Sequence, residues 1–172
     1  MTTLTLEALN RMDRAEFTRA LGAVFENSRW IAERAWESRP FASVDALHSA
    51  MMAVAREAPR DVQLSLLRAH PDLAGQAARA GTITTASVDE QASAGLDRLS
   101  EETYERFSRL NTAYREKFGF PFIVAVRRHD AAGILTAFEE RLGHSADEER
   151  EAALVQVGEI TRMRLDRLVR EP

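Results

Sequence analysis

The chain contains no cysteine among its 172 residues, and this absence excludes several kinds of chemistry at once. Disulfide bonds, thiolate nucleophiles and cysteine-ligated zinc sites cannot form. A cysteine-free chain fits a reducing compartment. The first residues also lack the basic region followed by an apolar run that is typical of a signal peptide. We therefore expect a cytoplasmic protein.

Long apolar runs and basic segments are missing as well. No uninterrupted apolar stretch approaches the roughly 20 residues that a membrane-spanning helix needs. The chain has 23 Lys and Arg against 27 Asp and Glu, a formal net charge of −4, and no segment is dominated by basic residues. We expect neither a membrane nor a nucleic acid as a partner. GxSxG, P-loop and GxGxxG motifs are lacking too, so those nucleophile and nucleotide sites are not indicated.

What the chain does contain is helical periodicity over most of its length. Ala, Leu, Glu and Arg dominate, and these residues favour helices. The pattern predicts one compact all-α domain over residues 1–172, with seven to nine helices and no linker or internal repeat. The predicted helices cover residues 13–26, 28–38, 43–58, 60–69, a short stretch beginning at Ser87, 100–117, 134–142 and 147–169.

One segment does not fit this pattern. Residues 120–126, Phe-Pro-Phe-Ile-Val-Ala-Val, are the only strand-like run in the chain. A single strand has no partner, and no second run of this type exists. We therefore expect an extended or short helical segment buried in the core.

His70 opens the sequence His-Pro-Asp-Leu-Ala-Gly at the end of a predicted helix. A residue before proline is disfavoured in the α region, which places His70 where the chain turns. One interpretation is that the ring only interacts with the last helical carbonyls. The other is that it presents a titratable ring to a cleft. Asp72 could then orient the imidazole or cap the next turn.

A second polar stretch begins twelve residues after the first. Ser87 and Glu90 match the capping-box pattern, which alone favours a structural role. The same arrangement would place a carboxylate and backbone N–H groups at a helix N-terminus, where they could hold a polar ligand. Gln91 adds an amide donor and acceptor, whereas Asp89 is expected to be a solvent-exposed charge.

Arg164 lies within the apolar face of the last predicted helix. At about 100° per residue, that face is formed by Leu and Ile or Val residues at 154, 157, 160, 165 and 168. A buried guanidinium needs a partner. The partner could be an internal Asp or Glu, or a substrate carboxylate or carbonyl bound in a fork geometry.

The remaining histidines, His48, His129 and His144, are expected at the surface. A metal site made of His70, Asp72 and Glu90 is a further alternative. The chain has no HExxH or comparable ligand spacing to support it.

Taken together, these residues resemble the 2-oxo-4-hydroxy-4-carboxy-5-ureidoimidazoline (OHCU) decarboxylase family. The resemblance covers essentially the whole chain, and HPDLAG followed in order by FGFPFI is its specific signature. The matching motifs are HPDLAG at 70–75, S-x-x-EQ at 87–91, AGL at 94–96, LN-x-x-Y at 110–114, FGFPFI at 118–123, IL-x-x-FE-x-RL at 134–142 and Arg164-Leu165.

The resemblance implies an all-helical, usually homodimeric enzyme that uses no metal or organic cofactor. It would convert OHCU to (S)-allantoin with loss of CO₂, in the breakdown of urate. His70 would be the catalytic acid or base and Glu90 its partner. The implied substrate-binding residues are Pro71, Ser87, Gln91, Phe122, Ile123, Val124, Ala125, Val126 and Arg164.

Two positions depart from the family pattern. Gln76 stands where Lys or Arg is expected after HPDLAG, and His144 is near a position where Asn is common. Both lie outside the implied catalytic set. The competing interpretation of the whole chain is a helical interaction module that keeps the scaffold without the activity.

Overall fold

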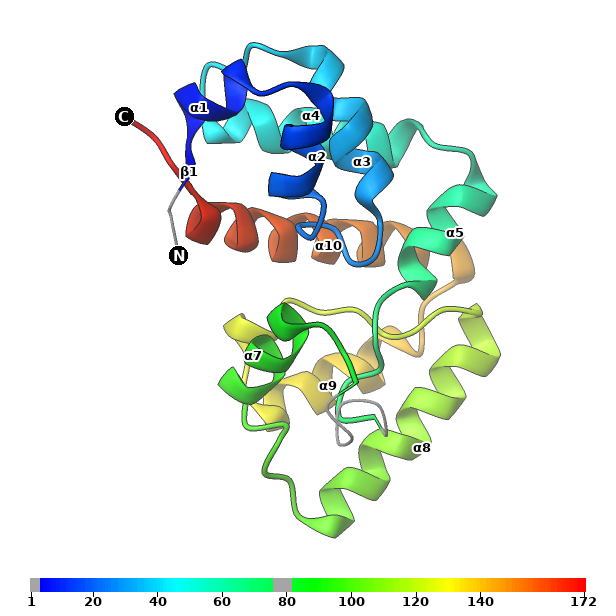
Figure 1. The fold of residues 1–172 in the computed structure, drawn as a ribbon. Helices are drawn as coiled ribbons and strands as arrows, with labels where there is room; N and C mark the ends of the chain where they lie inside the picture. Colours follow the sequence, from blue (N-terminus) through cyan, green and yellow to red (C-terminus); the bar gives the residue numbers. More distant parts are fainter. Residues whose placement is uncertain (1–3, 76–81) are drawn as a thin grey trace. The chain divides into compact units, whose positions relative to one another are not determined.

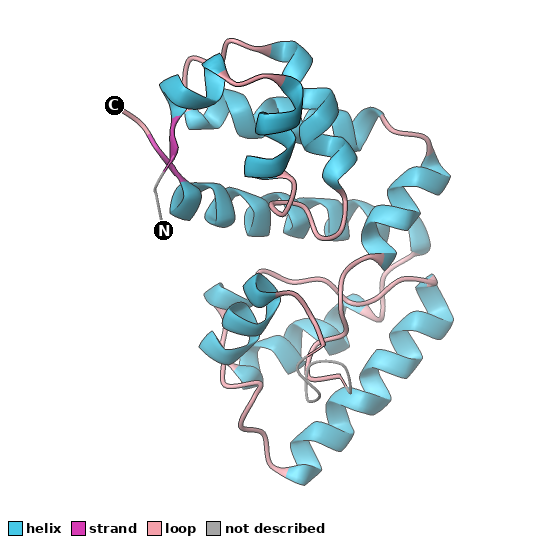
Figure 2. Cartoon of the chain, in the orientation of Figure 1, coloured by secondary structure: helices cyan, strands magenta, loops and turns pink. Residues whose placement is uncertain are grey.

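The structure is a computed structural model that describes residues 4–75 and 82–172 (Figures 1 and 2). Within these residues it contains nine α-helices, two 3-10 turns and one pair of two-residue strands. This confirms the all-α fold class and the expected number of helices. The chain divides into two compact units, Met1–Ala69 with Gly158–Pro172 (unit 1) and His70–Val157 (unit 2). That the two units together make one domain stays a prediction.

Unit 1 is built from the first five helices and the end of the last one. Its second helix begins with a capping box: the Asp13 side chain accepts from the Glu16 N–H, and the Glu16 side chain accepts from the Asp13 N–H. The apolar side of that helix, Phe17 and Leu21, is completely buried. The elements of unit 1 are α1 (Leu6–Arg11), α2 (Arg14–Leu21), α3 (Arg29–Ala35), η1 (Trp36–Ser38), α4 (Val44–Glu57) and α5 (Arg60–Arg68).

A small parallel strand pair in unit 1 was not predicted. Strand β1 (Leu4–Thr5) pairs with β2 (Val169–Arg170), with Leu4 opposite Val169. Two residues are too few to produce the alternation of apolar and polar side chains that identifies a strand in a sequence. Helix α1 was missed for a similar reason, since six residues make less than two helical turns.

Unit 2 contains α7 (Thr85–Ser93), α8 (Glu101–Phe118), η2 (Val126–Arg128), α9 (Ala131–Arg141) and the first part of α10 (Ala146–Leu168). Helix α10 continues from unit 2 into unit 1 after Val157. The core of unit 2 is aromatic. Phe122 stacks on Phe138 with ring centroids 4.0 Å apart, and Tyr114 meets Phe122 edge-on at 5.5 Å.

The strand-like run at residues 120–126 crosses this core without regular secondary structure until Val126, where η2 begins. Every residue in it is buried, and no strand of the described chain pairs with it. It begins after Gly119, whose left-handed φ of 78° ends α8 and turns the chain. The prediction of a buried, unpaired segment is therefore confirmed. Its backbone hydrogen bonds must come from outside a sheet.

Candidate functional site

The HPDLAG loop (residues 70–75) begins directly after α5, whose C-cap is Ala69. His70 follows this cap and is only 6% exposed. Its position between a helix end and Pro71 confirms the expected turn. The imidazole is thus held in a nearly buried setting, where packing can fix its orientation.

Side chains from α7 and α8 clamp the backbone of the loop. Gln91 donates through Nε2 to the Asp72 carbonyl at 3.2 Å, and its Oε1 accepts from the Ala74 N–H at 2.9 Å. Asn111 donates through Nδ2 to the Leu73 carbonyl, also at 2.9 Å. Three consecutive residues of the loop are therefore held by side chains from two helices.

Ala74 has a left-handed backbone, with φ at 51°. For a residue with a Cβ this conformation costs about 1–2 kcal/mol. The bond from its N–H to Gln91 is one of the contacts that hold it there. The amide of Gln91 therefore has a structural role, and its contact with substrate stays a prediction.

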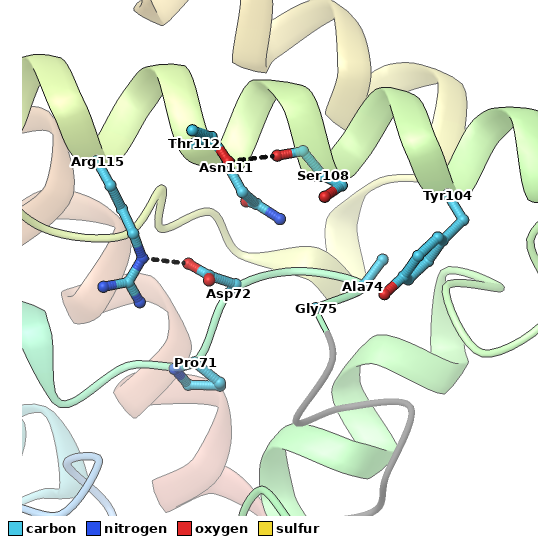
Figure 3. A pocket seen from close by; sticks show the side chains of 9 residues that line it. All are labelled: Pro71, Asp72, Ala74, Gly75, Tyr104, Ser108, Asn111, Thr112 and Arg115. Carbon is cyan, nitrogen blue, oxygen red and sulfur yellow. Dashed lines mark hydrogen bonds and ion pairs between the residues drawn. The ribbon is translucent and has the colours of Figure 1, made fainter.

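A pocket of about 450 Å³ lies between this loop and α8 (Figure 3). At one side of it Arg115 donates through Nε to Asp72 Oδ1 at 2.8 Å, so the carboxylate braces the loop against α8. Neither His70 nor Glu90 lines this pocket. The lining residues are Pro71, Asp72, Ala74, Gly75, Tyr104, Ser108, Asn111, Thr112 and Arg115.

Helix α7 begins three residues earlier than predicted, and the expected capping box is wrong. The N-cap is Thr84, whose Oγ1 accepts from the Ser87 N–H at 3.4 Å. Ser87 is thus the third residue of the helix and Glu90 lies in its second turn. Thr and Ser are both good N-cap residues, so the pattern could not choose between them. The expected placement of Glu90 among N-terminal backbone N–H groups is wrong for the same reason.

Two buried residues of the second motif share one face of α7. Ser87 and Gln91 are 4% and 5% exposed, and their spacing of four residues puts them side by side on one helix face. Glu90 is partly exposed, and Asp89 is exposed as expected. The structure thus brings Gln91 to the HPDLAG loop within unit 2.

Arg164 belongs to unit 1, and it is 7% exposed on the apolar face of α10. Its Nη1 donates to Glu26 Oε2 at 2.9 Å and to the Val24 carbonyl at 3.2 Å. The internal ion pair, one of the two alternatives, is confirmed. A guanidinium has five N–H donors, so a substrate-binding role is compatible with this pair and stays a prediction.

One of the three other histidines differs from expectation. His48 is half-buried, with Nε2 3.0 Å from Thr161 Oγ1, and burial followed by the nearby Arg162 charge lowers its pKa. His144 lies 3.0 Å from the buried Glu149 carboxylate. The His144 side chain is nevertheless 44% exposed, and His129 is exposed as predicted.

Neither a metal cluster nor a membrane span is found in the part of the chain that the structure describes. No three His, Asp or Glu side chains there come together to hold a metal ion, so His70, Asp72 and Glu90 do not form the alternative site. Over the same residues, no helix is long and apolar enough to cross a membrane. Gln76, one of the departures from the family pattern, lies outside the described residues.

The residues that hold the site in place were not identified from the sequence. Besides Asn111 and Arg115, they include two side chains that bind the 120–126 segment. Arg141 donates to the Ile123 carbonyl, and Gln156 Oε1 accepts from the Ala125 N–H at 2.9 Å. Asn111 and Arg141 belong to motifs that the family resemblance singled out, and this was the one available signal.

The chain is similar to known proteins over most of its length. A family model described as OHCU decarboxylase matches residues 10–166. The 2-oxo-4-hydroxy-4-carboxy-5-ureidoimidazoline decarboxylase of Haloferax volcanii is 49% identical over 162 residues, which are 94% of each chain. The protein of the same name from Halalkalicoccus jeotgali is 46% identical over 168 residues, 98% of this chain and 93% of the relative.

A solved structure has a similar fold. The crystal structure of an (S)-allantoin synthase is 32% identical, with a TM-score of 0.76. The match covers 97% of this chain and 54% of the synthase chain, so this chain spans about half of that structure.

Proposed function

Because the chain belongs to the OHCU decarboxylase family, we propose that it removes CO₂ from OHCU and gives (S)-allantoin in the breakdown of urate. The observation that carries this proposal is the identity of 46–49% to two named decarboxylases over more than nine-tenths of the chain. The chemical groups in unit 2 support it, because an imidazole, a carboxylate and a clamped loop suit acid–base chemistry.

The chemistry proposed is a heterolytic decarboxylation. The bond between the ring carbon and the carboxylate breaks, and its electron pair moves into the adjacent C=N bond of the substrate. CO₂ leaves, a C=C bond forms between the two ring carbons, and the nitrogen of the former C=N bond takes a proton. The neighbouring ring carbon that carries the ureido group then takes a proton, while the hydroxyl gives up its own proton and becomes the carbonyl of allantoin. Since the substrate accepts the electrons itself, the protein needs only to orient the carboxylate and to manage protons. Positioned acid–base groups contribute about 10²–10⁴-fold to such steps, and orientation adds to this.

In this proposal His70 hydrogen-bonds the hydroxyl and carboxylate end of the substrate and moves the proton. Glu90 holds the ring and ureido N–H groups. Arg164 binds an oxygen on which negative charge develops. What supports these roles is the match of each residue to the family motifs, together with the near-complete burial of His70 and Arg164.

The other implied contacts surround these three groups. Pro71 packs against the substrate, Ser87 and Gln91 hydrogen-bond it, and residues 122–126 offer backbone groups. For Gln91, the clamp on the loop supports an additional role, in which the amide fixes the backbone next to His70.

The proposal is tested with freshly generated OHCU. Its spontaneous decay yields racemic allantoin, so enzymatic turnover is recognised by the growth of a circular dichroism signal. We expect the protein to form (S)-allantoin faster than buffer alone, with full activity in EDTA, since no cofactor is proposed. Turnover no faster than buffer would favour the alternative, a helical interaction module without activity. Loss of activity in EDTA that one metal restores would contradict the cofactor-free mechanism.

We also propose a homodimer in the cytoplasm. The dimer is supported by the family resemblance, and the location by the absence of cysteine. Analytical ultracentrifugation tests the first, because a dimer has twice the 19.3 kDa mass of one chain. Cell fractionation tests the second.

A further inference from the structure

Two motifs that the proposed function leaves unused converge on one carboxylate. Glu149 of α10 is completely buried, and its Oε1 accepts from the Tyr114 hydroxyl and from Arg141 Nε, both at 2.6 Å. His144 Nδ1 lies 3.0 Å from Oε2. Tyr114 comes from the LN-x-x-Y motif and Arg141 from the FE-x-RL motif, so this carboxylate joins α8, α9 and α10.

The environment of Glu149 fixes the guanidinium of Arg141. A buried carboxylate requires paired charge and hydrogen bonds, and the Arg141 side chain is itself only 11% exposed. Burial, and then the bond to Glu149, raises the pKa of Tyr114 above its ordinary value. The phenol therefore stays protonated and continues to donate to the carboxylate.

The other side of the same guanidinium contacts the 120–126 segment. Arg141 donates through Nη1 to the Ile123 carbonyl, and its Cζ lies 4.4 Å from the centre of the Phe122 ring. Two residues further on, Gln156 holds the Ala125 N–H. Because no described strand pairs with this segment, these side chains take the place of a sheet in setting its backbone.

We infer that Arg141, fixed by Glu149, is a positioning residue that sets the backbone of residues 122–126 for substrate binding. The inference rests on the proposed function, because substrate contact by this segment comes from the family resemblance. Arg141 acts through the Ile123 carbonyl and the Phe122 ring, and we assign it no contact with the substrate.

The chain offers a matched control on the same pair of helices. Arg106 of α8 pairs with Glu139 of α9, and both side chains are about half exposed. In Arg141→Met we expect KM for OHCU to rise about tenfold with kcat within about threefold of wild type, since the displaced backbone of residues 122–126 is proposed to bind substrate and transition state alike. Arg106→Met should keep the wild-type KM.

Arg141→Lys separates positioning from stability. Lysine keeps a positive charge beside Glu149, but it is a point charge that cannot offer a planar fork to Glu149 and Ile123 together. We expect its melting temperature to lie closer to wild type than that of Arg141→Met, while its KM stays raised. If either folded variant has the wild-type KM, the inference is overturned. Where Arg141→Met does not fold, Arg141→Lys carries the same test.

A readout without activity distinguishes failure of this inference from failure of the proposed function. If the wild-type protein does not turn over OHCU, the proposed function is wrong. Amide hydrogen exchange of residues 120–126 then tests the positioning role alone. Faster exchange in Arg141→Lys than in Arg106→Met supports it, and equal exchange in the two variants contradicts it.

Discussion

Each compact unit of this protein contains a buried arginine–glutamate pair, and the two pairs hold different kinds of backbone. In unit 1, Arg164 pairs with Glu26 and donates to the Val24 carbonyl in the connection that follows α2. In unit 2, Arg141 pairs with Glu149 and donates to a carbonyl of the buried 120–126 segment.

The comparison shows that burial and pairing do not by themselves give an arginine its role. The planar guanidinium can bind a carboxylate and a carbonyl at the same time, and both pairs use this geometry. What differs is the backbone that is held. Arg164 is proposed to touch the substrate, whereas Arg141 is proposed to act on it only through residues 122–126. Substitutions in the two units should therefore affect different kinetic constants.

The largest effect is expected in unit 2, from the proposed acid–base group. His70→Asn should lower kcat by about 10²–10⁴-fold, the usual contribution of a positioned acid or base, with little loss of secondary structure. Steady-state kinetics and far-ultraviolet circular dichroism check both points. The control is His129→Asn, which changes an exposed histidine and should behave like wild type. A fully active His70→Asn protein would end the mechanism proposed here.

The second-largest effect is expected in unit 1, from the loss of Arg164. Arg164→Met leaves the Glu26 carboxylate without this buried charge, and breaking a buried ion pair costs about 3–5 kcal/mol of unfolding free energy. In this variant both kcat and kcat/KM should also fall, whereas in Arg141→Met kcat should stay close to wild type. Denaturant unfolding and kinetics on the folded fraction measure the two losses. Arg162→Met is the control, since that side chain is more exposed and pairs with exposed carboxylates. Severe instability with normal turnover would leave Arg164 with a structural role alone.

A smaller effect separates fold from site within α7. Thr84→Ala removes the N-cap and should cost about 1 kcal/mol of stability with KM and kcat unchanged. Ser87→Ala should show the reverse pattern, with a raised KM, since Ser87 is proposed to hydrogen-bond the substrate. Thermal melts and kinetics of the two variants compare them directly. If Ser87→Ala has wild-type kinetics, the serine has no part in binding.

The smallest effect is a pH dependence confined to unit 1. Burial, and then the charge of Arg162, lowers the folded-state pKa of His48 below its ordinary value of 6.5. The neutral form is favoured in the fold, so its contribution is present above about pH 6.5 and is lost as pH falls through the folded pKa. His48→Gln should therefore lose less unfolding free energy than wild type between about pH 7 and pH 5. Identical pH profiles would show that His48 does not contribute.

Much of the fold was predictable because its signals are local. Each of the caps at Asp13, Ser43 and Ser100 accepts from a backbone N–H only three residues further along the chain. The apolar residues of each long helix likewise recur every three to four positions. The start of α7 was not predictable in the same way, because two suitable N-cap residues stand three positions apart. The choice between them depends on tertiary packing.

The candidate site could also be predicted only in part. Motif residues such as His70 and Gln91 could be named from the sequence, since their types and spacing match a family pattern. The partners of the buried arginines could not, because Glu26 is 138 residues from Arg164 and only the fold brings them together. The same holds for Asn111, whose bond to Leu73 spans 38 residues.

The most direct test of the account follows the circular dichroism of allantoin during decay of freshly generated OHCU, with wild-type and His70→Asn proteins side by side. The account predicts a fast optical signal from wild type, and from His70→Asn a signal slower by at least about 100-fold. Equal signals from the two proteins, or no signal above buffer from wild type, would contradict it.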